Sequence, residues 1–180
     1  EIMSAVKLGL SVVKFFPANV YGGLTALKSL SAPFPGVKFL PTGGINSHNI
    51  GDYIAAPFIH AVGGSWICTR KDIADGNFDK ITALCREARQ NALGFEFAHF
   101  GINCENVESS TEVSNFFQTA FDFPLKDGSS SVFAGSAVEV MKQPGPGANG
   151  HIGFRTPCLN RAVRYLKAMG VSFREETAKR

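Results

Sequence analysis

Lys14 has the residue type and the surroundings best suited to covalent chemistry in this sequence. It lies within Ser11-Val12-Val13-Lys14-Phe15-Phe16, an otherwise apolar or small run typical of a strand buried on both faces. Burying a lysine cation costs free energy, so desolvation favours the free amine, which can condense with a ketone to form an iminium. Strand alternation places Lys14 opposite Val13 and Phe15. A lysine that extends to water at the strand end, or that pairs with an acid, would fit the same pattern.

Two glycine pairs follow later apolar runs, and each has a hydroxyl residue beside it. Thr42-Gly43-Gly44 comes after residues 37–40, and Gly63-Gly64-Ser65 comes after residues 59–62. Backbone N–H groups at such turns, beside a helix N-terminus, can approach an anion. The two turns therefore predict a phosphate or carboxylate site, although glycine pairs also occur in ordinary tight turns.

Three potential metal ligands occur in the second half of the chain. His99, Glu139 and His151 each lie in a segment with strand character. Histidine and glutamate side chains from separate strands can meet at one divalent ion. Both histidines could instead be surface residues at strand starts, and Glu139 lies between two valines, as an exposed strand residue would. His48 and His60 have no evident partner, and we expect them at the surface.

The first half of the chain alternates helices with strands. We expect helices at residues 1–8, 24–30, 47–55 and 78–92, and strands at residues 11–16, 37–40 and 59–62. Helices between strands of this spacing favour right-handed parallel βαβ units. Glycines just after each strand are typical of a (β/α)8 barrel, whose active site lies at that end. Three strands cannot close a barrel, so residues 1–92 predict an α/β domain that is the C-terminal portion of a TIM barrel.

The pattern changes from residue 94. We expect a strand at 97–103, a helix from near 111 with Ser109 or Ser110 as its N-cap, strands at 124–127, 131–134 and 137–141, and a loop at 143–150. His151-Ile152-Gly153-Phe154 then repeats His99-Phe100-Gly101-Ile102 at an offset of 52 residues. A helix with Thr156 as N-cap and a strand at 171–173 should follow. Residues 94–180 therefore predict an α+β domain of βαβββ repeats, the second of which is truncated.

Three motifs of the first half resemble a known family when taken together. They are Val13-Lys14-Phe15-Phe16-Pro17-Ala18, Pro41-Thr42-Gly43-Gly44-Ile45 and Val62-Gly63-Gly64-Ser65-Trp66. In this order they resemble the 2-keto-3-deoxy-6-phosphogluconate (KDPG) and 4-hydroxy-2-oxoglutarate (KHG) aldolases. The resemblance covers about residues 1–70. It implies a class I aldolase, a lyase without a cofactor that cleaves a keto acid to pyruvate and an aldehyde.

The resemblance also implies roles for individual residues. Lys14 would form the Schiff base, Gly43, Gly44 and Ser65 would hold the substrate phosphate, and Thr42 would line the same pocket. In this family the general acid/base glutamate and a carboxylate-binding arginine lie on early strands, and no acid of this sequence matches that base. Its absence should slow proton transfer by about 10²–10⁴-fold. We therefore expect sequence to be missing at both ends, and residues 1–180 alone to lack aldolase activity.

The βαβββ layout of the second half resembles the vicinal-oxygen-chelate superfamily, which includes glyoxalases and bleomycin-resistance proteins. The resemblance implies metal ligation by His99, Glu139 and His151, with the fourth ligand on a strand that this sequence lacks. Many proteins of this fold bind no metal. The second half could therefore be a separate metal-dependent enzyme, or a small-molecule-binding module that regulates or tethers the first half.

Composition restricts the classes of partner. The chain has 180 residues, 44% of them hydrophobic, and a net charge of +3, which suits an anionic small substrate and gives no indication of nucleic-acid binding. No apolar run is long enough to cross a membrane, and no signal peptide is evident. Cys68, Cys85, Cys104 and Cys158 form no metal-binding or disulfide pattern, so we expect buried thiols and a cytoplasmic protein. The aldolase resemblance adds a keto-acid substrate and a homotrimer.

Overall fold

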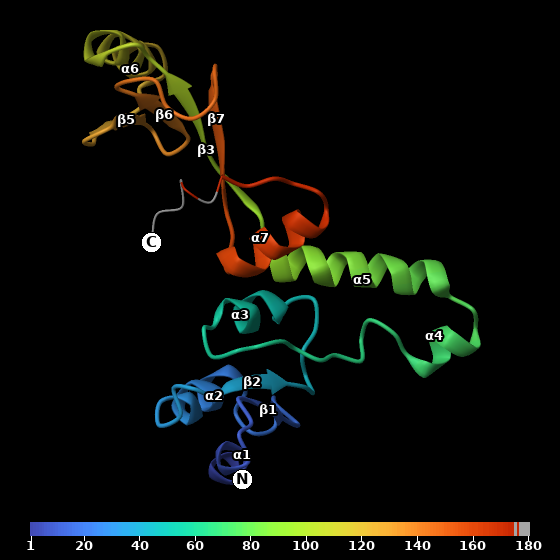
Figure 1. Cartoon of the computed structure of the whole chain (residues 1–180). Helices are drawn as coiled ribbons and strands as arrows, with labels where there is room; N and C mark the ends of the chain where they lie inside the picture. Colours follow the sequence, from blue (N-terminus) through green and yellow to red (C-terminus); the bar gives the residue numbers. More distant parts are fainter. Residues whose placement is uncertain (175, 177–180) are drawn as a thin grey trace. The chain divides into compact units, whose positions relative to one another are not determined.

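The computed structural model describes residues 1–174 and 176, which divide into two compact units (Figure 1). The first unit contains Glu1–Gly94 together with the residues from Thr156 onward, and the second unit is Phe95–Arg155. The first boundary between the units therefore lies between Gly94 and Phe95. The predicted second domain of 94–180 differs from this division, because the helix after Thr156 groups with the first unit.

The first unit has a parallel strand pair as its centre. Its elements in chain order are α1 (Ile2–Lys7), β1 (Val12–Phe15), α2 (Gly23–Ser31), β2 (Lys38–Pro41), α3 (Ile50–Ala55), α4 (Arg70–Ala74), α5 (Phe78–Leu93) and, after the second unit, α7 (Leu159–Ala168). Lys14 pairs with Leu40 in the β1–β2 register. The predicted strand at 59–62 is reduced to two parallel bridges, Phe39↔Ile59 and Thr42↔Gly63. The sequence pattern did not predict the short helix α4.

Apolar side chains on one face of this strand pair form the core of the first unit. Phe39 of β2 is 1% exposed, and Leu27 of α2 is fully buried. Ile50, Tyr53 and Ile54 of α3 complete the same cluster, which explains why burial raises the pKa of the Tyr53 hydroxyl. The strands are therefore covered by helices on the face that carries Phe39, and Lys14 and Leu40 occupy the other face.

Polar contacts attach α7 to the rest of the first unit. The Thr156 hydroxyl donates to the Leu93 carbonyl over 2.6 Å, so it does not cap α7, whose N-cap residue is Cys158. The Arg161 guanidinium donates to the carbonyls of Ile54 and His60. The predicted strand at 171–173 does not form, and these residues are irregular.

The second unit is a five-stranded sheet with one helix. Its elements are β3 (Glu96–Asn103), α6 (Val107–Phe121), β4 (Leu125–Asp127), β5 (Ser131–Ala134), β6 (Val138–Met141) and β7 (Gly150–Arg155). The strand order is β4-β5-β6-β3-β7. β4, β5 and β6 form the predicted antiparallel meander, β3 pairs parallel with β6, and β7 pairs antiparallel with β3. The two copies of the His-x-Gly repeat are therefore hydrogen-bonded neighbours.

The helix α6 lies against β5 and β6 (Figure 1). Small buried residues, Ser110 and Ser114, allow the helix to approach Val132, Ala134 and Val140 on that face of the sheet. The helix begins four residues earlier than expected. Asn106 is the N-cap, and its side chain forms a reciprocal capping box with Ser109.

Two further observations concern the cysteines and the helices. Cys68 and Cys85 are exposed and Cys104 is buried, so burial of all four thiols was wrong, although the cysteines are unpaired as expected. Among the described residues, no helix is both long enough and apolar enough to span a membrane.

Candidate functional site

Lys14 lies on β1, on the face of the strand pair that the core helices do not cover. Its neighbours Val13 and Phe15 are half-buried against the core, whereas Lys14 itself is exposed. Its amine lies 5.5 Å from the centre of the Phe16 ring. Of the two alternatives left by the sequence, the structure therefore shows the lysine that reaches water. Two strands and two bridges cover only one side of the lysine, and shielding its other side from water would require further strands.

The Thr42-Gly43-Gly44 turn follows β2 and is tied to the end of β1. The Thr42 N–H donates to the Phe15 carbonyl over 2.9 Å, and the Ala18 N–H donates to the Thr42 carbonyl over 2.8 Å. Gly43 and Gly44 have φ angles of 92° and 80°, a left-handed conformation that favours glycine. The turn therefore lies directly beside the strand that carries Lys14.

The second glycine turn reaches the same edge of the sheet. The Gly63 N–H donates to the Pro41 carbonyl, and a Cβ on Gly63 would lie 2.9 Å from the Thr42 hydroxyl oxygen. That hydroxyl is buried and has no hydrogen-bond partner in the described part of the chain. Ser65, two residues on, is exposed. Lys14, Thr42 and the two turns thus come from the C-terminal ends of neighbouring parallel segments, as predicted.

His99, Glu139 and His151 converge in the second unit. The Nε2 atoms of the two histidines are 3.1 Å apart, and they lie 3.2 and 3.4 Å from one Glu139 carboxylate oxygen, Oε2. Ligand atoms about 2.0–2.1 Å from a tetrahedral ion are about 3.3 Å apart. The three atoms therefore have the spacing of one face of a tetrahedral metal site. All three side chains are largely shielded, with exposures between 16% and 25%.

The surroundings of this cluster combine apolar and unsatisfied polar groups. The rings of His99 and Phe133 are close to perpendicular, with 5.7 Å between the ring centres. Nδ1 of His151 is buried and makes no hydrogen bond within the described residues. The same three distances also suit a hydrogen-bonded cluster without an ion, because an imidazole N–H can donate to the other imidazole nitrogen or to the carboxylate oxygen.

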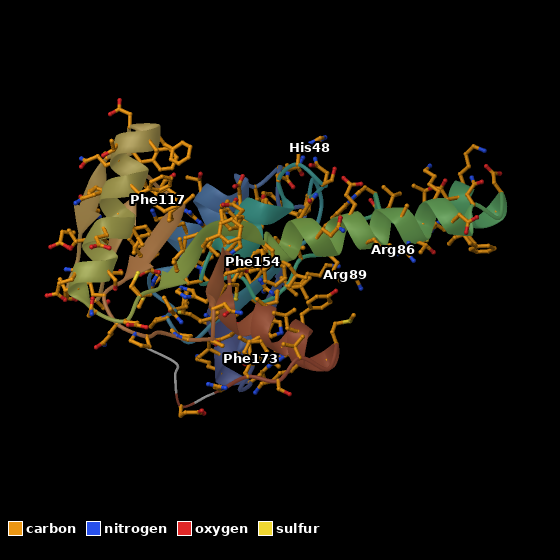
Figure 2. The ribbon with its side chains drawn as sticks, turned by 90° about the horizontal axis from the view of Figure 1, so that it is seen from above. His48, Arg86, Arg89, Phe117, Phe154 and Phe173 are labelled. Carbon is orange, nitrogen blue, oxygen red and sulfur yellow. The ribbon has the colours of Figure 1, made fainter. Side chains whose placement is uncertain are left out.

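The remaining histidines and the helix charges lie outside these clusters. His48 and His60 are exposed, as expected, and Figure 2 shows His48 at the margin of the first unit. Arg86 and Arg89 are exposed along α5, and the Arg89 guanidinium lies 5.4 Å from the centre of the Tyr165 ring. Both arginines therefore lie outside the two candidate sites.

Comparison with known proteins relates the first unit to one family. Residues 1–84 match the family model described as KDPG and KHG aldolase. The 2-dehydro-3-deoxy-phosphogluconate aldolase of Treponema pallidum is 44% identical over 90 residues, which are 50% of this chain and 43% of that protein. The KHG/KDPG aldolase of Escherichia coli is 42% identical over 92 residues, 51% of this chain and 43% of that protein.

One solved structure is similar in sequence to part of this chain. The KDPG aldolase of Legionella pneumophila, captured with pyruvate as a covalent carbinolamine, is 46% identical over 47% of this chain and 41% of that chain, with a TM-score of 0.45. The chain spans less than half the length of the curated relatives named above. About half of the chain is thus homologous to KDPG/KHG class I aldolases.

Proposed function

We propose that the first unit is the Schiff-base part of a class I aldolase that acts on 2-keto-3-deoxy-6-phosphogluconate or 4-hydroxy-2-oxoglutarate. The observation that carries this proposal is the position of Lys14, on the open face of the strand pair and beside the Thr42-Gly43-Gly44 turn, within the region homologous to these aldolases. The Lys14 amine would attack the keto carbon, and loss of water would give the iminium. The substrate hydroxyl next to the broken carbon–carbon bond would lose its proton to water, its oxygen would become the aldehyde oxygen, and the two electrons of the broken bond would enter the iminium to leave an enamine.

We also propose that the two glycine turns hold the acidic end of the substrate. Backbone N–H groups of Gly43 and Gly44, with the hydroxyls of Thr42 and Ser65, would face a phosphate or carboxylate group. Protonation of the enamine and hydrolysis would return the amine and release pyruvate. Lys14 is exposed here and no matched general base is present, so cleavage by this chain should be about 10²–10⁴-fold slower than by a complete barrel.

The rate of pyruvate release tests this proposal. Both substrates should be offered to the chain, to Lys14→Arg and to Lys28→Arg, whose lysine is an exposed residue of α2. Arginine keeps the positive charge but does not form an iminium. In place of the inactivity expected from the sequence, we expect a slow residual release that Lys14→Arg abolishes and Lys28→Arg leaves unchanged. Equal release by all three proteins would contradict the role of Lys14.

A second candidate function rests on the convergence of His99, Glu139 and His151. We propose that the second unit is glyoxalase-like and binds one divalent cation through two imidazole nitrogens and one carboxylate oxygen. The spacing of 3.1–3.4 Å and the shielding of the three side chains support this proposal. A bound cation of this kind supplies Lewis acidity to an oxygen ligand at its open positions.

Elemental analysis after incubation with zinc, nickel or manganese salts, followed by dialysis, tests the metal proposal. We expect about one equivalent of metal per chain, its loss in His99→Ala and its retention in His60→Ala. His60 is an exposed histidine of the first unit and serves as the matched control. No retained metal, or equal retention by both variants, would favour the hydrogen-bonded cluster over a metal centre.

A further inference from the structure

Each candidate ligand histidine lies over a glycine of the neighbouring strand. In the antiparallel β3–β7 pair, His99 is opposite Gly153, and Gly101 is opposite His151. A Cβ on Gly153 would lie 2.4 Å from Cε1 of His99, and a Cβ on Gly101 would lie 1.9 Å from Cε1 of His151. Real Cβ atoms do not approach this closely. Each imidazole therefore occupies the space that a side chain on the opposite strand would fill.

This exchange is reciprocal because the His-x-Gly segment occurs twice and the two copies pair with each other. Each strand contributes one histidine ring and one glycine, and each ring lies over the glycine of the other strand, so the two rings approach each other. Their planes are 84° apart and their Nε2 atoms are 3.1 Å apart. Any larger residue at either glycine would have to displace the facing ring from this position.

The carboxylate is held by a third supporting residue. The Ser131 hydroxyl on β5 donates to Oε1 of Glu139 over 2.6 Å, and Ser131 is only 6% exposed. The other oxygen, Oε2, is the atom that faces both histidines. The hydrogen bond from Ser131 therefore occupies Oε1, and Oε2 remains available to bind a cation.

We propose that Ser131, Gly101 and Gly153 are positioning residues that fix the three ligand side chains for a divalent cation held by one Glu139 oxygen and two imidazole nitrogens. The inference rests on the proposed metal function of the same site. Ligands held in this way lose less rotational freedom when the ion binds, so the supports raise affinity without touching the ion. Removing such a support typically weakens metal binding about 10–100-fold.

Three serines in sequence allow a matched test of Ser131. Zn²⁺ affinity should be measured by competition with a chromophoric chelator for the full chain and for Ser131→Ala, Ser131→Thr and Ser129→Ala. Ser129 is exposed and precedes the strand. We expect Ser131→Ala to weaken Zn²⁺ binding about 10–100-fold. Ser131→Thr, which keeps the hydroxyl, should recover most of the loss, and Ser129→Ala should match the unsubstituted chain.

The glycines are tested by the geometry of the bound ion. The Co²⁺ absorption spectrum of Gly101→Ala and Gly153→Ala should change in position and intensity, because one nitrogen ligand is displaced in each. A chain that binds no Zn²⁺ or Co²⁺ would overturn the metal function and, with it, the positioning role. Equal Zn²⁺ affinities of the Ser131→Ala variant and the Ser129→Ala variant would overturn the positioning role alone. Ser131→Ala keeps the inference falsifiable if an alanine at either glycine prevents folding.

Discussion

Gly44 is the position in the candidate anion-binding turn that should tolerate a side chain least. Its φ of 80° lies in the left-handed region, where an alanine costs about 1–2 kcal/mol. A Cβ there would also lie 2.5 Å from Cβ of Asn19, an atom that rotation about χ1 cannot move away. Shifting packed backbone costs about 1–3 kcal/mol. Gly44→Ala should therefore destabilise the first unit by about 2–5 kcal/mol.

Urea unfolding monitored by tryptophan fluorescence measures the loss of stability in the first unit. Trp66 is the single tryptophan of the chain and packs against the core of the first unit. Gly36→Ala is the matched control, because Gly36 has nothing within 4 Å of its Cβ position and no positive φ. This control should change stability by no more than about 1 kcal/mol, and in the stabilising direction, through the unfolded chain.

A double-mutant cycle separates the two costs of Gly44→Ala. Combining it with Asn19→Gly removes the clash and leaves the backbone cost, so the interaction energy should be about 1–3 kcal/mol in favour of the double variant. If Gly44→Ala were as stable as Gly36→Ala, the turn would not have the described conformation. If the cycle showed no interaction, Asn19 would not lie against Gly44.

The remaining predictions concern stability in both units. Phe39→Ala should cost about 3–5 kcal/mol in the same fluorescence assay, because the side chain is 1% exposed at the centre of the core. Hydrogen bonds, the most important of them from Lys80, lower the pKa of the Asp72 carboxyl from 3.8 to about 2. The ionised carboxylate therefore stabilises the fold above pH 4, and this contribution is lost as the pH falls toward 2. Asp72→Asn should make the stability depend less on pH between 4 and 2 in an acid titration. Asn106→Ala should destabilise the second unit by about 1 kcal/mol, because it removes the capping box of α6; urea unfolding followed by circular dichroism of the whole chain checks this loss.

The local elements of this chain were largely predictable, and the pairings between distant segments were not. The apolar run around Lys14 and the Pro41-flanked run gave the parallel pair β1–β2, because both runs suit strands buried on one or both faces. The segment 59–62 has similar residues but forms only two bridges. A strand requires a ladder of hydrogen bonds to its neighbour as well as propensity.

In the candidate sites, too, the contacts that depend on pairing between distant segments were not predictable from the sequence. His99, Glu139 and His151 were predicted to meet from their residue types on separate strands, and the β3–β7 pairing brings the two histidine rings within hydrogen-bond distance. The contact of Ser131 with Glu139 had no signal in the sequence, because it depends on the β5–β6 register. The local sequence pattern likewise did not determine the exposure of Lys14, because burial of this side chain depends on how many strands surround it.

Borohydride trapping with pyruvate tests most directly whether Lys14 is the amine that bonds to the substrate. Borohydride reduces an iminium to a stable secondary amine, which peptide mapping assigns to one lysine. We expect a pyruvate-dependent adduct on Lys14 that is lost in Lys14→Arg and more abundant when additional barrel strands surround the lysine. An adduct confined to another lysine, in both contexts, would contradict it.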